Sequence, residues 1–191
     1  MKRDIIVIGA SAGGIQALSQ LFARFQPHLQ AAIGVVIHRH PQGNVNLATV
    51  LSRSSSLELV EAENGMHFQH GRIHLAPRDY HLVLEKQQVL LLNHGPKQHF
   101  LRPAIDVLFT SAAVHYGRRV IGLILTGGGS DGTAGVSAIT AHNGIALAQD
   151  PEEAQAPWMP RNALLHDHVE RRVLLEEIPS IFTELTGSQS W

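Results

Sequence analysis

The sequence contains no cysteine, and its formal net charge is only −1 when histidine is counted as neutral. The absence of cysteine excludes disulfides and thiolate chemistry, and it fits a reducing compartment. The charge balance lacks the basic excess that marks most nucleic-acid-binding domains. We therefore expect no nucleic-acid partner.

Long apolar runs are also missing. The N-terminal run covers only Ile5 to Ile8 before glycines follow, which is shorter than the roughly 7–15 residues of a signal-peptide core. No stretch approaches the ~20 apolar residues that a membrane span needs. We expect a cytoplasmic protein without membrane insertion. At 191 residues and 44% hydrophobic content, residues 1–191 are expected to form a single globular domain.

Apolar runs alternate with helical patterns along most of the chain, and this alternation is typical of an α/β fold. We predict a doubly wound, mostly parallel sheet with helices on both faces. The expected strands are Asp4–Gly9, Ala31–Ile37, Val120–Thr126 and Ile145–Gln149. The expected helices lie before Pro27, at Asn46–Arg53, at Pro103–Tyr116 and between Asp131 and Asn143, with two short ones near the C-terminus.

The middle of the chain has a different pattern. Three short apolar segments follow one another closely, at Gly71–Pro77, His81–Glu85 and Val89–Asn93. Such spacing favours antiparallel pairing. We predict an antiparallel hairpin at one edge of the sheet.

The first predicted strand runs into "GASAG", Gly9 to Gly13, which fits the G-x-S-x-G pattern of a nucleophile elbow at Ser11. The alternative is a phosphate-binding turn. A dinucleotide fingerprint would need glycine in place of Ser11, and an acidic residue roughly 20 residues later. The segment "FQPHLQAAIGVV" contains no acid. The pattern by itself leaves both interpretations open.

A serine nucleophile needs a base and an orienting carboxylate. His38 and His40 both follow the second predicted strand, and the carboxyl ends of parallel strands meet at one edge. Asp131 follows another strand in a glycine-rich loop and is the favoured carboxylate, although it could merely cap its helix. Asp79, Asp106 and Asp150 are alternatives. The chain order Ser, His, Asp differs from that of ordinary α/β-hydrolases.

Other polar residues have simpler interpretations. His67, His70 and His74 cluster without matching acids or cysteines, so we expect no metal site there, and the proposed chemistry needs no nucleotide or other cofactor. Arg102 could bind an acidic partner surface or could be a solvated or capping arginine.

Taken together, these segments resemble the catalytic domain of the CheB-type protein-glutamate methylesterases. The resemblance covers nearly the whole chain. It is carried by "IGASAGG", "VVIHRHP", "EAENG", "IHLAPRDYHL", "RPAIDVLF", "ILTGGGSDGTAG" and "MPRNAL", which occur in the order and spacing of that family.

The resemblance implies a serine hydrolase that demethylates glutamate methyl esters on the cytoplasmic helical region of methyl-accepting chemoreceptors. Some family members also deamidate receptor glutamines. It implies that Ser11 is the nucleophile, His38 the base and Asp131 the orienting carboxylate. His38 is preferred to His40 because it alone keeps the family spacing to "EAENG" without a gap. The alternative is a non-catalytic module that binds a receptor or regulator.

The chain departs from the family pattern at three places. Around His38, the family's usual Gln or similar residue is Ile37, and its usual Met and Pro are Arg39 and His40. Arg78 replaces a usual glycine, and Gly128 replaces a usual methionine. These departures leave the three implied catalytic residues intact and bear on the choice of substrate. The family's N-terminal receiver domain is not seen in these 191 residues, so we expect any regulator to act in trans.

Overall fold

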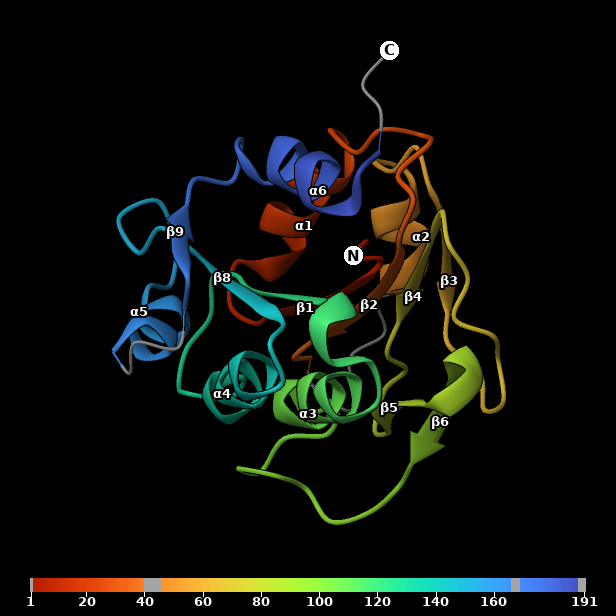
Figure 1. Cartoon of the computed structure of the whole chain (residues 1–191). Coiled ribbons are helices and arrows are strands. Elements are labelled where there is room, and N and C mark those ends of the chain that lie inside the picture. Colours follow the sequence, from red (N-terminus) through yellow and green to blue (C-terminus); the bar gives the residue numbers. More distant parts are fainter. Residues whose placement is uncertain (1, 40–45, 166–168, 189–191) are drawn as a thin grey trace.

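The centre of the molecule is a seven-stranded sheet in the order β3-β4-β2-β1-β7-β8-β9, and all of its strand pairs are parallel (Figure 1). The structure is a computed structural model and describes residues 2–39, 46–165 and 169–188. The strands of the sheet are β1 (Ile5–Ala10), β2 (Ala32–Ile37), β3 (Glu58–Glu61), β4 (Arg72–Leu75), β7 (Val120–Ile124), β8 (Ile145–Gln149) and β9 (Arg171–Val173).

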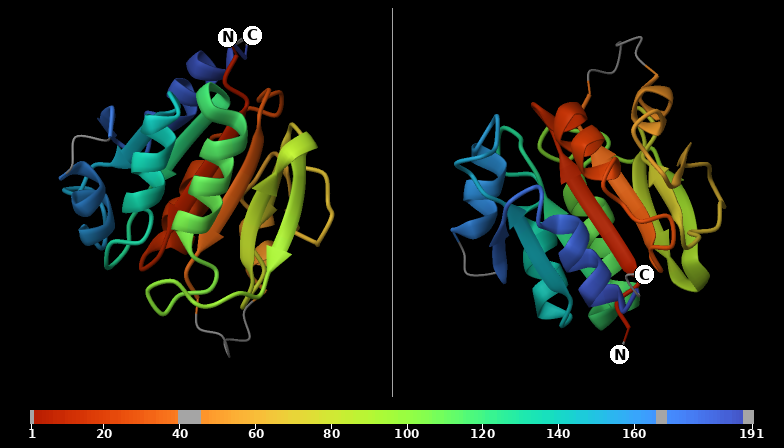
Figure 2. Two further views of the ribbon diagram at one scale, coloured as in Figure 1. Left: turned by 60° about the horizontal axis from the view of Figure 1, so that its bottom comes forward. Right: turned by 90° about the horizontal axis from the view of Figure 1, so that it is seen from above.

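Helices cover both faces of the sheet, as Figures 1 and 2 show. On one face lie α1 (Gly14–Phe22), α2 (Leu47–Ser52) and α6 (Ile178–Thr186); on the other lie α3 (Ile105–Tyr116) and α4 (Thr133–Ala141), with α5 (Trp158–Leu164) beside α4 and the β8 end. Side chains of β1 alternate between the two cores, with Ile6 and Ile8 on one face and Ile5 and Val7 on the other. The predicted fold class is confirmed.

Continuous apolar runs became central strands because both faces of a parallel sheet are covered. Every residue of β1, β2 and β7 is buried. The helix ends also follow local chemistry. The side chain of Asn46 accepts a hydrogen bond from the backbone N–H of Thr49 and caps α2. Asn143, beyond the end of α4, has the left-handed backbone (φ 62°) that often follows a helix end.

The middle of the chain corrects one detail of the sequence-based prediction. The segment around β4 is a parallel strand of the main sheet, paired with β2 and β3. Only β5 (His81–Glu85) and β6 (Val89–Asn93) form an antiparallel hairpin, and it is a separate two-stranded sheet that packs on α3. The apolar runs of strand length therefore predicted the strands correctly, but they did not predict which strands pair with each other.

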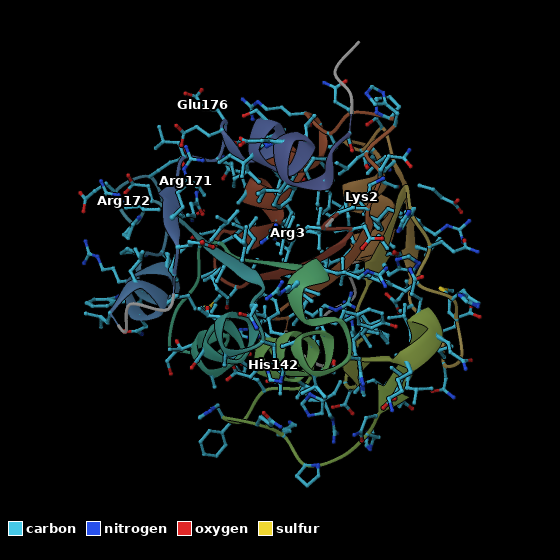
Figure 3. The ribbon with its side chains drawn as sticks, in the orientation of Figure 1. Lys2, Arg3, His142, Arg171, Arg172 and Glu176 are labelled. Carbon is cyan, nitrogen blue, oxygen red and sulfur yellow. The ribbon has the colours of Figure 1, made fainter. Side chains whose placement is uncertain are left out.

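Two edge strands were not predicted, because they lack apolar runs. Two of the four residues of β3 are exposed glutamates, and β9 contributes the exposed Arg171 and Arg172. In Figure 3 these two arginines lie on β9 at the margin of the molecule. Charged side chains on edge strands discourage pairing with other chains. In the described part of the chain, no helix has both the length and the apolar character needed to cross a bilayer.

Candidate active site

The carboxyl ends of the three central strands bring the predicted site residues to one edge of the sheet. The backbone N–H of His38, just after β2, donates to the carbonyl of Ala10 at the end of β1 (3.0 Å). The backbone N–H of Ser11 donates to the carbonyl of Thr126, just after β7 (2.9 Å). Ser11, His38 and the loop that carries Asp131 are therefore neighbours, at the edge where open α/β sheets bind ligands.

The turn at Ser11 depends on two glycines. Gly13 begins α1 with a left-handed backbone (φ 76°), which a residue with a side chain rarely adopts. Gly127 lies against the turn from the facing loop, and a Cβ added there would be 2.8 Å from the Cβ of Ser11. The tight strand-to-helix turn and the closely packed loop leave Ser11 partly exposed at the mouth of a cavity.

His38 and Asp131 form a buried pair. Nε2 of His38 lies 2.7 Å from Oδ2 of Asp131, and the two side chains are only 9% and 2% exposed. No hydrogen bond joins Ser11 to His38 in the described residues, although both line the same cavity. The other candidate base, His40, lies outside the described residues.

The alternative carboxylates are placed differently. Asp79 pairs with Arg102 and His94 on a partly exposed surface, and Asp150 pairs with Arg172. The guanidinium of Arg102 donates two hydrogen bonds to Asp79 and thereby holds its own loop in place. Neither carboxylate contacts His38.

Asp131 caps a helix, but the helix is α3 and not the α4 that follows it. Its Oδ2 accepts the backbone N–H of Ile105 (2.7 Å) and its Oδ1 accepts that of Asp106 (3.0 Å). Burial opposes the charge on Asp131, but the hydrogen bonds from His38 and these two N–H groups outweigh it and hold its pKa below the usual value. The carboxylate therefore stays charged beside His38.

Asp106, the third alternative carboxylate, is a second buried carboxyl group next to Asp131, and among the described residues no hydrogen bond joins it to His38. Its Oδ1 accepts the backbone N–H groups of Gly132 (3.0 Å) and Gly135 (2.7 Å). Burial and the neighbouring Asp131 charge outweigh these bonds and raise the pKa of Asp106 to about 6. It lies in "RPAIDVLF", one of the segments that carry the family resemblance.

The loop between β7 and Asp131 is anchored by residues from both earlier and later in the chain. The backbone N–H of Thr126 donates to the side chain of Gln149 (2.9 Å), and the Thr126 hydroxyl donates to the carbonyl of Ala12 (2.9 Å). The side-chain amide of Asn162, from the "MPRNAL" segment, donates to the carbonyl of Gly129 (2.7 Å). These bonds fix the loop against the Ser11 turn.

Two cavities meet at His38 and Arg39. One, of about 520 Å³, is lined by Ser11 together with the apolar Ile15 and Ile37 and with Arg78; the other, of about 340 Å³, is lined by Lys97, Phe100 and Arg102 among others. Among the described residues, neither lining includes an acidic side chain.

The two arginines of the first cavity lie close enough to affect each other. Burial lowers the pKa of the Arg39 guanidinium, its ion pair with Glu61 raises it, and the nearby Arg78 cation lowers it further. The guanidinium of Arg39 is held by the carbonyl of Ala76 (2.9 Å) and by Glu61 (3.3 Å). The approach to Ser11 is thus both apolar and positively charged.

Two of the three clustered histidines, His70 and His74, have separate contacts. His74 is buried against the ring of Phe68, and burial lowers its pKa to about 4. His70 pairs with Asp4 (3.1 Å). Within residues 2–39, 46–165 and 169–188, no group of three or more histidine, aspartate or glutamate side chains is arranged to hold a metal ion.

Comparison with known proteins places this geometry in a family. A family model described as CheB methylesterase matches residues 6–182. A Leptospira interrogans protein, provisionally named protein-glutamate methylesterase/protein-glutamine glutaminase, is 35% identical over 97% of this chain and 96% of its own length. A Pyrococcus abyssi protein-glutamate methylesterase/protein-glutamine glutaminase is 37% identical over 93% of this chain, which spans 49% of that relative.

The fold agrees with the sequence relationship. The crystal structure of the Thermotoga maritima CheB methylesterase catalytic domain superposes with a TM-score of 0.91 at 31% identity, and the match covers 97% of this chain and 100% of that domain. With the sequence and the fold in agreement, the chain belongs to the CheB methylesterase family.

Proposed function

We propose that this protein is a serine hydrolase that removes methyl groups from glutamate methyl esters on the cytoplasmic signalling helices of chemoreceptors. The observation that carries the proposal is the buried His38–Asp131 pair beside the exposed turn of Ser11. The names of the relatives supply the ester and amide substrates. Residues 1–191 act as one catalytic domain in the cytoplasm.

The first half of the reaction forms an acyl-enzyme. Ser11 Oγ attacks the ester carbonyl, and His38 takes the serine proton. Because Nε2 of His38 faces Asp131, Nδ1 is the nitrogen left for this proton. The charged Asp131 fixes the ring and stabilises the imidazolium. His38 then gives the proton to the departing methoxide, and methanol leaves.

The second half returns the free glutamate. A water molecule loses its proton to His38 and attacks the acyl carbonyl. The serine oxygen leaves and takes the proton back, so both residues are regenerated. A glutamine carboxamide would follow the same course with ammonia as the leaving group, which is the basis for a deamidase activity.

The turn also supplies stabilisation for the negatively charged oxygen of the tetrahedral intermediates. Among the described residues, no acceptor pairs with the backbone N–H of Ala12, directly after Ser11. This group lies in the turn that leads into α1, where free N–H groups favour negative charge. We assign Ala12 N–H as an oxyanion donor.

The cavities indicate what surrounds the scissile ester. The cationic Arg39, Arg78 and Lys97 and the exposed Phe100 line the approach on either side of His38. A helical polypeptide that carries acidic side chains beside the methylated glutamate fits such a lining. This supports a protein substrate over a small free ester.

The test is methanol release from membranes that carry methylated chemoreceptors, combined with fluorophosphonate labelling of the serine. Ser11→Ala should fold normally, because the structure uses Ser11 through its backbone, and should lose roughly 10⁴-fold or more in kcat. Ser130→Ala, which removes an exposed hydroxyl at the same edge of the sheet, is the matched control. Retention of a tenth of the activity in Ser11→Ala would refute the mechanism. Lack of both labelling and methanol release in the unmodified protein would favour a non-catalytic binding role.

A further inference from the structure

Helices α3 and α4 each have their N-terminus capped by an acidic residue that belongs to the other. Asp131, which precedes α4, accepts the first two N–H groups of α3. Asp106, in the first turn of α3, accepts the N–H groups of Gly132 and Gly135 at the start of α4. As whole residues, Asp106 is 7% exposed and Asp131 is 4% exposed. The exchange joins the two helix ends into one buried unit.

Among the residues that the structure describes, no other side chain caps the start of α4. Its N-cap residue, Gly132, has a left-handed backbone (φ 99°) and no side chain. A Cβ added there would lie 2.4 Å from Cδ1 of Ile124, and the left-handed backbone itself would strain any residue with a side chain. The first N–H groups of a helix need acceptors. At this end, Asp106 supplies one for two of them.

This cap acts directly on the peptide unit that carries Asp131. The N–H of Gly132 belongs to the same planar peptide as the carbonyl of Asp131. When Asp106 holds that N–H at 3.0 Å, it fixes the plane next to the Asp131 side chain. Asp131 in turn must place one oxygen within 2.7 Å of both His38 Nε2 and the N–H of Ile105. Small rotations of the peptide would break these contacts.

We propose that Asp106 is a positioning residue of this site, which holds Asp131 in hydrogen-bonding geometry with His38 by capping α4 from α3. The catalytic consequence rests on the proposed function. The positioning of Asp131 depends on where the acceptor oxygen of residue 106 lies, and it does not depend on the negative charge of Asp106. Asparagine keeps that acceptor where aspartate has it, alanine removes it, and glutamate keeps the charge but moves the acceptor one carbon further out.

The experiment compares Asp106→Ala, Asp106→Asn and Asp106→Glu with the unmodified protein. The matched control is Ser111→Ala, on the same helix, which removes an oxygen that accepts the N–H of Leu84 (3.0 Å) away from the site. Two quantities are measured. One is the pair of imidazole ¹⁵N chemical shifts of His38, assigned by their loss in His38→Gln. The other is kcat and KM for methanol release.

The proposal expects Asp106→Ala to move the His38 shifts toward those of a solvated histidine. It also expects kcat to fall about 10- to 100-fold while KM stays within about twofold, since misplacement of a catalytic group acts on the chemical step. Asp106→Asn should leave the His38 shifts unchanged and should lower kcat by no more than about threefold. Asp106→Glu should resemble the alanine variant. Ser111→Ala should lower the melting temperature without changing the His38 shifts or the kinetic constants.

Three results would overturn the proposal: unchanged shifts and kcat in Asp106→Ala, rescue by glutamate and not by asparagine, or an equal loss in Ser111→Ala. If Asp106→Ala does not fold, the order of asparagine and glutamate decides. The ¹⁵N shifts do not depend on activity. A protein that hydrolyses no ester but shows the expected shifts would contradict the proposed function and leave the positioning role supported.

Discussion

His38 Nε2 and Asp131 Oδ2 lie 2.7 Å apart, although 93 residues separate them in the sequence. Their contact exists because β2 and β7 flank β1 in the sheet, so that the loops after all three strands open at one edge. The pair is buried, and the contact with Asp131 occupies Nε2, which leaves Nδ1 as the other nitrogen of the ring. This geometry makes specific demands on each member.

His38 is expected to be the base, in preference to His40. His38→Gln should lower kcat by orders of magnitude, because glutamine cannot take the serine proton and Asp131 loses its partner. His40→Gln should keep kcat within a few-fold. Parallel measurement of kcat for the two variants gives the answer, and a larger loss in His40→Gln would reverse the assignment.

Asp131→Asn is expected to lower both activity and stability. Both carboxylate oxygens accept hydrogen bonds, from Ile105, Asp106 and His38, whereas asparagine offers one acceptor oxygen. We expect kcat to fall about 10⁴-fold, as for the orienting aspartate of the best-studied triad, and the free energy of unfolding to fall by about 1–3 kcal/mol.

The matched control for Asp131→Asn is Asp150→Asn, at the other strand-end carboxylate, which pairs with Arg172. It should leave kcat unchanged. Urea unfolding and methanol-release kinetics on both variants separate the two effects. If Asp131→Asn loses stability but keeps near-normal kcat, Asp131 is only a helix cap.

The sequence could predict those parts of the fold and site whose chemistry is local. Buried parallel strands produce continuous apolar runs, so β1, β2, β7 and β8 were predicted close to their observed ends. The Ser11 turn was recognisable because its pattern, two glycines flanking a serine, lies within five consecutive residues. The edge strands β3 and β9 were missed since their exposed, charged residues give no apolar run.

The relation between Asp106 and Asp131 could not be predicted for a different reason. An acid in the first turn of a helix, or just before one, is ordinarily interpreted as acting on its own helix. Here each acts on the other's helix, 25 to 29 residues away in sequence. Only the packing of α3 against α4 reveals this exchange.

The separation of the β5–β6 hairpin from the main sheet could not be predicted from the sequence either, since strand pairing is a tertiary property.

Asp106 should also make stability depend on pH. Its pKa is about 6 in the folded protein, above the usual value of 3.8. Between these values the folded state binds more protons than the unfolded state, so stability falls as pH rises from about 4 through about 6. Asparagine resembles the neutral acid and removes this loss. Asp106→Asn should therefore gain stability relative to the unmodified protein between pH 5 and pH 8.

The measurement is the melting temperature of both proteins at pH 5, 6, 7 and 8. The groups that face Asp106 are Asp131 and, through it, His38. Both are present in the two proteins, so the comparison isolates the side chain at position 106. A difference that stays constant across this range would show that Asp106 does not titrate there.

The last prediction concerns the cationic lining of the two cavities. Arg78→Gly, which introduces the glycine usual in the family, and Lys97→Ala each remove a positive charge near Ser11 and His38 without touching the reacting groups. For an acidic receptor helix we expect KM to rise about 3- to 10-fold with kcat within about twofold, because exposed charge pairs contribute roughly 1 kcal/mol or less. The difference in KM between variant and unmodified protein should shrink from 50 mM to 500 mM salt, as screening shortens the reach of each charge to a few ångströms.

Arg24→Ala, at an exposed arginine that lines neither cavity, is the control and should leave KM unchanged. Equal KM values for all variants at low salt would show that the lining does not select acidic substrates, and a fall in kcat with constant KM would place these cations in the chemical step instead.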